Sequence, residues 1–281
     1  MAFKSGIIID KKYQLGRVIG SGVYGRVYDC REIGKPLELV LKENTNSDVT
    51  KLEAKVLRTV SGRAGVQKLM GEGTLGNSPY IIVVKEGVHL EELLKRHAGP
   101  LPIWKVLTIL HSGTEGLRSL HTRYISHRDL SGANILVSSR VGAKVILVDY
   151  GLSGIHNPDG TVQEAGRYDT SEYYYGSGPV RRGSPFEFCD DLFALFMICL
   201  ECSSHNPLPK NGEKIPLELL DRLAKNNLDQ KLPSTTFRNF VWSLKIESRS
   251  PTGRMPRIPD HNTLKAVVEK SSHFNQNTIL N

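Results

Sequence analysis

Two polar tripeptides near the middle of the chain have residue types and a spacing that suit phosphate chemistry. The first, His127-Arg128-Asp129, is followed by Asn134, and the second, Asp149-Tyr150-Gly151, comes directly after the mainly apolar run at residues 144–148. Transfer of a phosphoryl group requires a carboxylate that orients the attacking hydroxyl and accepts its proton, together with oxygen ligands for Mg²⁺. Asp129 suits the first role, and Asn134 and Asp149 suit the second. Either tripeptide alone is more often a helix-terminal salt bridge or an ordinary turn, but both at this spacing favour a catalytic loop.

A glycine-rich segment near the N-terminus supplies a candidate surface for the phosphates. Residues 13–20 and 25–30 have the pattern of two strands, and the glycines between and beside them complete G-x-G-x-x-G. The same pattern opens dinucleotide sites, but those require a helix directly after the glycines. Val27 and Tyr28 instead continue a strand, which favours a hairpin whose backbone approaches phosphate oxygens without a Cβ in the way. We therefore expect a nucleotide-binding hairpin that includes Ile19, Gly20, Ser21, Gly22, Gly25 and Val27, with Ile19 and Val27 closing on the adenine.

A lysine and a glutamate in the next two elements are candidates for a functional ion pair. Lys42 ends a predicted strand at residues 37–42, where a lysine usually only extends its amine from an edge into water. Its position after the glycine hairpin also suits contact with nucleotide phosphates, and an acid must then hold it in place. Residues 48–60 predict a helix with an apolar stripe, and Glu53 lies one step from that stripe. We predict that Lys42 pairs with Glu53.

The remaining strands complete a small lobe that ends in a hinge. Residues 66–70 and 80–84 are expected to finish a five-stranded antiparallel sheet, and residues 85–89 connect it to a helix at residues 90–96. We expect adenine to lie against this connection, with Val83 at the back of the pocket and Val84 and Leu136 also lining it. Residues 1–85 would form the nucleotide-binding lobe, and residues 86–281 would form the lobe that carries the catalytic loop and substrate site.

The second lobe is expected to be mainly helical. An amphipathic helix at residues 103–123 leads to the catalytic loop, and residues 190–201 are apolar nearly all round, as in a buried central helix. Asp191 at the start of that helix is placed either to cap it or to hold the catalytic-loop backbone. Further helices are expected at residues 216–225, 236–246 and 262–270. The long irregular stretch from Gly151 to about residue 183 indicates a functional loop, and its Thr170, Ser171 and tyrosines are phosphorylation candidates that are more often simply packed or exposed.

Composition narrows the class of protein. The net charge of +8, with 39% hydrophobic and 23% charged residues, is ordinary for a globular protein with an affinity for nucleotide and acidic substrates. The chain has no apolar run near the roughly 20 residues of a spanning helix, no secretory pattern at its start and no nucleic-acid-binding motif. Cys199 and Cys202 form a C-x-x-C inside an apolar run, which favours core packing over metal or redox chemistry. We therefore expect an intracellular protein, in the cytoplasm or nucleus, that is neither secreted nor membrane-spanning.

Taken together, these motifs resemble those of eukaryotic-type protein kinases over residues 13–270. Within that superfamily the chain is most similar to the casein kinase 1 and vaccinia-related kinase group, through residues 52–69, 180–195 and 237–268. The resemblance implies a bilobal α+β fold, ATP and Mg²⁺ as cofactors, and phosphorylation of Ser or Thr in acidic or already phosphorylated protein sites. It also implies that Asp129 is the catalytic base, that Lys42, Glu53 and Asn134 complete the catalytic set, and that Asn134 and Asp149 hold the metal.

Three departures from the family pattern accompany the resemblance. Ser131 stands where Ser/Thr kinases usually carry a lysine that meets the γ-phosphate, which gives the loop a tyrosine-kinase style. Tyr150 replaces phenylalanine and adds a hydroxyl that needs a hydrogen-bond partner. The tripeptide Ala-Pro-Glu, which anchors the activation segment in the family, is absent.

Three functional hypotheses remain at this stage. The first is an active protein kinase, and the second is a pseudokinase scaffold that binds ATP or partners without turnover. All the expected catalytic groups are present, which favours activity. A small-molecule kinase of related fold ranks last, because such proteins usually lack the glycine hairpin and the C-terminal pattern found here.

Overall fold

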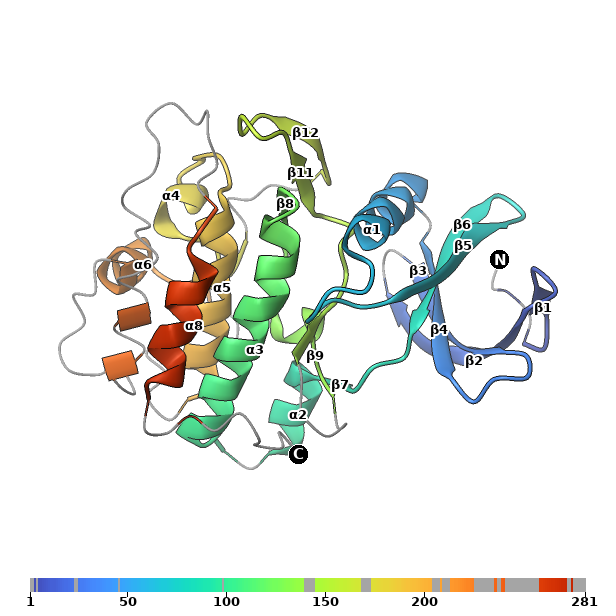
Figure 1. Cartoon of the computed structure of the whole chain (residues 1–281), viewed down its shortest axis with the longest axis horizontal. Coiled ribbons are helices and arrows are strands. Elements are labelled where there is room, and N and C mark those ends of the chain that lie inside the picture. Colours follow the sequence, from blue (N-terminus) through green and yellow to red (C-terminus); the bar gives the residue numbers. More distant parts are fainter. Residues whose placement is uncertain are drawn as a thin grey trace.

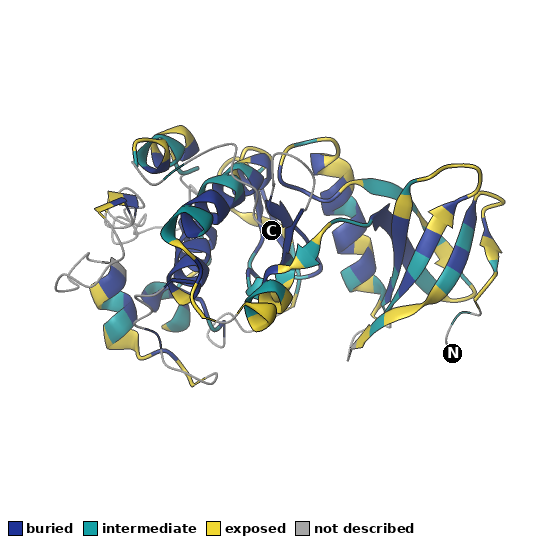
Figure 2. Ribbon diagram, turned by 90° about the horizontal axis from the view of Figure 1, so that it is seen from below, coloured by how far each residue is buried: buried dark blue, intermediate teal, exposed yellow. Residues whose placement is uncertain are grey.

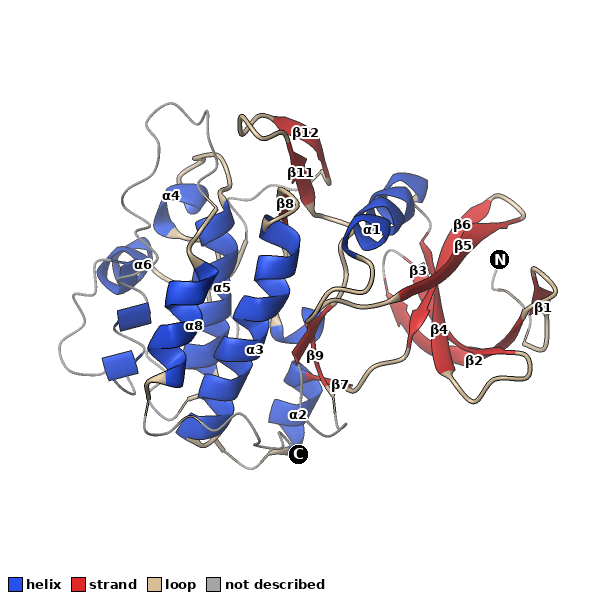
Figure 3. Ribbon diagram, in the orientation of Figure 1, coloured by secondary structure: helices blue, strands red, loops and turns tan. Residues whose placement is uncertain are grey.

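Strands gather on one side of the molecule and most helices on the other (Figures 1 and 3). The computed structural model describes residues 3, 5–22, 25–44, 46–97, 99–138, 145–167, 173–203, 208, 213–224, 235–236, 239–240, 258–271 and 274. The expected α+β, two-lobed architecture is confirmed. Thr170, Ser171 and most of the helix expected at residues 236–246 lie outside the described residues.

The strand side is an antiparallel sheet in the order β1-β2-β3-β4-β6-β5. Its strands are β1 (Ile8–Ile9), β2 (Tyr13–Gly22), β3 (Gly25–Glu32), β4 (Glu38–Asn44), β5 (Leu69–Leu75) and β6 (Ser78–Val84). The expected number of five strands is therefore wrong by one. Ile8 and Ile9 pair with Gln14 and Tyr13, which adds a sixth strand too short to produce an alternating pattern in the sequence.

The start of β5 also differs from the expected residues 66–70. Val66 forms an isolated parallel bridge with Leu147 of the other lobe, so the strand proper begins only at Leu69. The apolar character of Val66 reflects burial between the two lobes rather than membership of the sheet.

Helix α1 (Ser47–Val60) packs on one face of this sheet. Asn46 caps it by accepting a hydrogen bond from the backbone N–H of Asp48, and the predicted stripe of Leu52, Val56 and Val60 is buried. The opposite face of the sheet has its own apolar cluster, in which Tyr28 is completely buried and its ring stacks on Phe3. The N-terminal segment thus covers the face that α1 does not.

The other lobe is built around two long helices, α3 and α5, and Figure 2 shows much dark blue at the centre of this lobe. Its helices are α2 (Leu90–Arg96), α3 (Ile103–His121), α4 (Gly178–Arg181), α5 (Phe188–Glu201), α6 (Leu217–Ala224) and α8 (His261–Glu269). Every residue of α5 except Glu201 is buried, as its apolar sequence predicts. Cys199 and Cys202 are buried free thiols of this core, which confirms their packing role.

Short strands hold the loops that connect these helices. One three-stranded sheet joins β7 (Val88–His89), β9 (Ile135–Val137) and β10 (Val145–Leu147), and another joins β8 (Ile125–Ser126), β11 (Gly154–His156) and β12 (Val162–Ala165). A 3₁₀ turn, Gly132–Asn134, precedes β9. No helix within the described ranges has the length and apolar character needed to cross a membrane.

The sixth strand can be tested with two neighbouring isoleucines. Ile9 is 4% exposed, whereas Ile8 is 56% exposed. Ile9→Ala removes buried methyl groups and should lower the free energy of unfolding by about 2–4 kcal/mol, while Ile8→Ala should change it by less than about 0.5 kcal/mol. Urea unfolding of both variants measures the difference, and equal effects would show that β1 does not pack on the sheet.

Candidate active site

The loop between β8 and the 3₁₀ turn holds its first residue deep in the core. His127 is fully buried; its Nε2 donates to the carbonyl oxygen of Val148 at 3.1 Å, and its Nδ1 accepts from the backbone N–H of Asp129 at 3.4 Å. Burial lowers the pKa of His127. A neutral ring with its proton on Nε2 satisfies both contacts, so the imidazole is a structural support for the loop.

Asp191 fixes the backbone of the same loop from helix α5. Its carboxylate accepts hydrogen bonds from the N–H groups of His127 at 2.8 Å and Arg128 at 2.9 Å, and from Nε2 of His121 at 3.0 Å. Of the two roles considered for Asp191, holding the catalytic-loop backbone is therefore confirmed. The helix is capped instead by Glu187 and Asp190, which form a reciprocal capping box.

Asp129 and Asn134 face each other at the mouth of the loop. The amide nitrogen of Asn134 donates to the backbone oxygen of Asp129 at 2.7 Å and to its Oδ2 at 3.0 Å. This contact turns the amide oxygen of Asn134 away from Asp129. Burial, together with the nearby charge of Asp149, raises the pKa of Asp129 to about 6. Asp129 is thus a stronger base than an aspartate in water.

The segment Asp149-Tyr150-Gly151 projects one carboxylate outward and one ring inward. Asp149 is exposed and has φ +66°, a left-handed conformation that side-chain-bearing residues adopt at a cost. The hydroxyl of Tyr150 donates to the carbonyl oxygen of Leu147 at 2.5 Å, and its ring packs on His127 with the centroids 5.3 Å apart. The extra hydroxyl of Tyr150 therefore has the partner that the sequence led us to expect. Tyr150 anchors the strained turn that presents Asp149.

The predicted ion pair between Lys42 and Glu53 is confirmed. Nζ of Lys42 lies 2.9 Å from Oε1 of Glu53, and their side chains are 22% and 8% exposed. Burial disfavours the ammonium, but the carboxylates of Glu53 and Asp149 outweigh this effect and raise the pKa of Lys42. The lysine stays charged and points at the side of the cavity where Asp149 lies.

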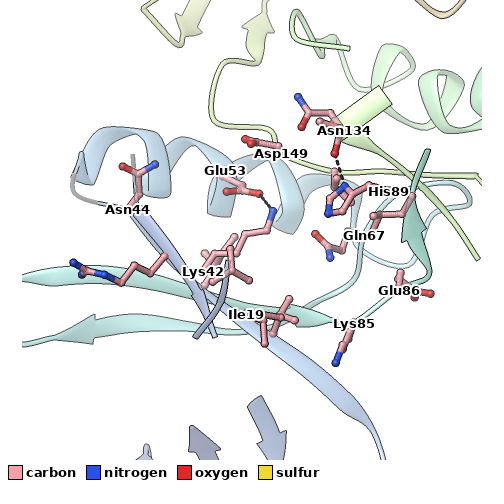
Figure 4. Close-up of a pocket in the computed structure, with 18 of the residues that line it drawn as sticks. Ile19, Lys42, Asn44, Glu53, Gln67, Lys85, Glu86, His89, Asn134 and Asp149 are labelled. Atoms are coloured by element: carbon pink, nitrogen blue, oxygen red, sulfur yellow. Dashed lines mark hydrogen bonds and ion pairs between the residues drawn. The ribbon is translucent and has the colours of Figure 1, made fainter. Parts of the chain in front are cut away.

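These groups surround a cavity of about 510 Å³ between the sheet and the helical lobe (Figure 4). Of the residues predicted to bind nucleotide or metal or to act in catalysis, eight line it: Ile19, Gly25, Val27, Lys42, Glu53, Asn134, Leu136 and Asp149. Asp129 is not one of the lining residues, but it accepts a hydrogen bond from Asn134, which is. The sequence thus identified groups on five separate segments that the fold brings together.

Other predicted residues lie off the cavity wall. Gly20, Ser21 and Gly22 continue the β2–β3 hairpin beyond it, paired with Val27, Arg26 and Gly25. The prediction that Val84 lines the pocket is wrong, because its side chain packs in the cluster on the far face of the sheet. Val83 belongs to the core shared with α1. In an antiparallel strand, alternate side chains point to opposite faces, and on β6 it is Ile81 that lines the cavity.

Gly25 is required for a reason different from the one inferred from the sequence. A Cβ at this position would lie 1.9 Å from the carbonyl oxygen of Glu43 on the neighbouring strand. Only glycine permits β3 and β4 to approach this closely, and this approach sets the distance of Lys42 from the hairpin.

His89 and Gln67 are among the cavity residues that the sequence analysis did not single out. Nδ1 of His89 lies 2.5 Å from the carbonyl oxygen of Ala133, which links the hinge to the catalytic loop. Gln67 is 3% exposed and also lines the cavity. Gln67 could have been noticed as a polar residue within an apolar stretch, whereas His89 has no distinguishing neighbour in the sequence.

The oxygen atoms of Asn134 and Asp149 suit Mg²⁺, which takes few of its ligands from protein side chains, rather than a metal held entirely by the protein. The amide oxygen of Asn134 and the exposed carboxylate of Asp149 are hard oxygen donors of the kind that Mg²⁺ prefers. No group of three or more His, Cys, Asp or Glu side chains among the described residues is arranged to hold a metal. A cation here would complete its coordination with phosphate oxygens and water.

Comparison with known proteins agrees with this geometry. A family model described as the protein kinase domain matches residues 13–270. The chain is 26% identical to the serine/threonine-protein kinase pkn2 of Myxococcus xanthus over 229 residues, which are 75% of this chain and 27% of that protein. It is 27% identical over 165 residues to the probable serine/threonine-protein kinase YbdM of Bacillus subtilis, covering 56% of this chain and 63% of that protein. It is also 29% identical over 161 residues to the MAP3K epsilon protein kinase 1 of Arabidopsis thaliana, covering 54% of this chain and 12% of that protein.

The role of Asp191 as the anchor of the loop predicts a specific loss. In Asp191→Asn, an amide N–H₂ group would face backbone or imidazole donors, so the free energy of unfolding should fall by about 2–4 kcal/mol. The backbone amides of His127 and Arg128 should lose protection from hydrogen exchange.

Asp221 provides the matched control for this variant. It pairs with Arg182 near the surface, so Asp221→Asn should cost less than about 1 kcal/mol. Unchanged protection of His127 and Arg128 in Asp191→Asn would refute the anchoring role.

Proposed function

Because the matched region spans most of its length, the chain belongs to the protein kinase domain family, and we propose that it transfers the γ-phosphate of ATP to hydroxyl groups of proteins. The observation that carries the proposal is the convergence of Lys42–Glu53, Asp129–Asn134 and Asp149 on one cavity. A carboxylate base, two oxygen ligands for Mg²⁺ and a buried ammonium are the groups that phosphoryl transfer requires.

Each group has a distinct part in the proposed reaction. Asp129 accepts the proton of the attacking hydroxyl, for which its raised pKa makes it well suited. Lys42 binds phosphate oxygens while Glu53 holds it in place. Asn134 and Asp149 hold Mg²⁺, which neutralises charge on the phosphates when bound. Ile19, Val27 and Leu136 form the apolar walls against which the base packs.

We propose Ser and Thr as the acceptor residues. Two of the relatives described above bear the name serine/threonine-protein kinase. Ser131, in place of the family's lysine, lines a neighbouring cavity rather than the nucleotide cavity, so Lys42 is the lysine proposed to contact the phosphates. The alternative is a scaffold without turnover; the presence of Lys42, Glu53, Asp129, Asn134 and Asp149 supports activity, because degenerate kinases commonly lose one of these groups.

Two further points extend the proposal. We propose that the boundary between the lobes follows residue 85, which is supported by the end of β6 at Val84 and the start of the next strand at Val88. Kinship with the casein kinase 1 and vaccinia-related kinase group rests on the sequence patterns at residues 52–69, 180–195 and 237–268.

A second cavity, of about 910 Å³, is the proposed site for the acceptor protein. It opens beside the catalytic loop, is lined by residues 131–133, and contains the carboxylates of Glu91 and Glu201 among its described residues. Glu91 pairs with Lys95, whereas Glu201 accepts a hydrogen bond from the neutral hydroxyl of Tyr175. The lining therefore favours a basic side chain near the acceptor hydroxyl. The acidic or phosphorylated context expected from the sequence rests on the overall net charge of +8 and the family resemblance alone.

Asp129→Asn tests the reaction itself. With labelled ATP, Mg²⁺ and a mixture of protein substrates, the unaltered chain should yield phosphoserine and phosphothreonine. Because the variant cannot accept the hydroxyl proton, transfer should fall by about 10²–10⁴-fold, with ATP binding retained. Asp159→Asn, in the exposed turn before β12, is the control that should keep full activity. ATP binding without transfer by the unaltered chain would favour the scaffold.

Glu201→Gln tests the acceptor site. The KM for a serine peptide flanked by arginines should rise by about tenfold through the loss of a charged partner, while the KM for ATP and for an acidic peptide should not rise. Glu218→Gln, on α6 outside this cavity, should change none of these constants. A lower KM for acidic than for basic peptides in the unaltered chain would contradict this charge preference.

A further inference from the structure

The N-terminal segment lies against the face of the sheet that α1 leaves uncovered. Phe3 packs there on the far-face cluster, and its ring stacks on the ring of Tyr28 with the centroids 5.5 Å apart and the planes 23° apart. Further along, Gly6 donates its N–H to the carbonyl oxygen of Leu15 at 2.8 Å, and Leu15 donates its own N–H to the carbonyl oxygen of Ile7 at 2.9 Å. The segment is therefore held by an aromatic ring and by main-chain hydrogen bonds to β2.

The hydroxyl of Tyr28 joins this segment to a buried carboxylate. It accepts a hydrogen bond from the backbone N–H of Phe3 at 3.0 Å and donates one to Oε2 of Glu43 at 3.0 Å. The guanidinium of Arg26 lies 3.9 Å from the same oxygen. Tyr28 is completely buried and Glu43 is 5% exposed, so water does not readily replace these donors. Because a buried carboxylate needs its hydrogen-bond donors, Tyr28 fixes the place of the Glu43 side chain, and Phe3 fixes the direction of the hydroxyl.

Glu43 and Arg26 also belong to the wall of the nucleotide cavity. They face each other on β4 and β3, and both line the cavity together with Asn44. Alternate side chains of a strand point to opposite faces, so the side chain of Glu43 lies on the far face while that of Lys42 points into the cavity. In Figure 4, Asn44 lies at the end of the cavity away from the hinge. The contacts of Glu43 therefore reach the end of the cavity where phosphate is proposed to bind.

The glycine hairpin is in tight contact with Glu43. A Cβ at Gly25 would lie only 1.9 Å from the carbonyl oxygen of Glu43. A strand contact this close leaves no room for one partner to move without the other. A displacement of Glu43 must therefore move Gly25, and with it the start of β3, relative to Lys42.

We propose that the N-terminal segment positions the phosphate end of the nucleotide cavity, with Phe3, Tyr28 and Glu43 as positioning residues. This inference rests on the proposed binding of ATP. When Phe3 lies on Tyr28, the hydroxyl is held toward Glu43, and the hairpin and Lys42 keep the spacing that phosphate binding requires. All of these contacts lie within the sheet lobe. Loss of the docked segment should therefore weaken nucleotide binding and leave the acceptor cavity unchanged.

The affinity of the full chain for ATP with Mg²⁺, measured by calorimetry, tests this role. Phe3→Ala removes the stacked ring and Tyr28→Phe removes the hydroxyl, and each should raise the Kd for ATP by about threefold to tenfold, as expected for one lost hydrogen bond. The double variant should be no weaker than the more affected single variant, because both changes act through the same hydroxyl. The KM for a serine peptide should stay within about twofold in all three variants.

Two further variants control for a purely structural effect. Phe3→Tyr keeps the ring and the backbone N–H, so it should retain the Kd of the unaltered chain. Phe274→Ala removes a ring that stacks on His111 in the helical lobe, with the centroids 4.8 Å apart. It should leave the Kd for ATP unchanged, although it removes an aromatic contact of the same kind.

The outcomes separate this inference from the proposed function. An unchanged Kd for ATP in Phe3→Ala and Tyr28→Phe would overturn the positioning role while leaving kinase activity intact. A rise of the same size in Phe274→Ala, or in the KM for the peptide, would also overturn it, because the effect would then be a general loss of stability. A chain that binds ATP but transfers no phosphate would overturn the proposed function, and the ratios of Kd would still decide the inference. A chain that does not bind ATP would overturn both.

Discussion

The buried ion pair between Lys42 and Glu53 is the constraint on which the site depends. Lys42 comes from a strand and Glu53 from a helix, so the 2.9 Å contact exists only when α1 is packed against the sheet in one position. Removing either partner would leave an uncompensated charge in a poorly solvated place. A buried pair of this kind adds little net stability. It does lower the free energy of one arrangement of helix and sheet relative to slightly shifted arrangements. Burial of the apolar stripe of α1 offsets the cost of removing these two charges from water.

A second buried carboxylate provides the corresponding constraint in the helical lobe. Asp191 holds two consecutive backbone N–H groups of the catalytic loop, and His121 bridges it to His261 of α8 through a 2.9 Å contact between the rings. Burial lowers the pKa of both histidines to about 3, so they remain neutral. The loop that carries Asp129 is thus tied to the middle of the core, whereas Lys42 is tied to the sheet. The cavity lies where these two rigid supports meet.

Much of the fold and site could be predicted from the sequence because the signals are local. The helix that carries Glu53 has a helical stripe, the catalytic groups have fixed spacings, and α5 is apolar all round. The failures have physical causes. β1 has only two residues, and its place in the sheet comes from pairing with Tyr13 and Gln14 rather than from its own pattern. Val84 was placed on the wrong face because a run of five apolar residues on β6 gives no alternation from which to assign faces.

Gln67 shows the limit of such reasoning most clearly. The structure places its side chain in the cavity wall and pairs its Nε2 with the carbonyl oxygen of Val84. Both facts arise from the packing of the helix, the sheet and the hinge around it. No local pattern in the sequence carries that information.

The central claim is that Lys42 and Glu53 act in phosphoryl transfer as one unit. The most direct test is the kcat/KM for ATP of Lys42→Met, Glu53→Gln and the double variant, measured with Mg²⁺ under identical conditions. If Glu53 acts only by holding Lys42, the double variant should be no slower than Lys42→Met alone. Losses that multiply in the double variant, or full activity in Glu53→Gln, would contradict the claim.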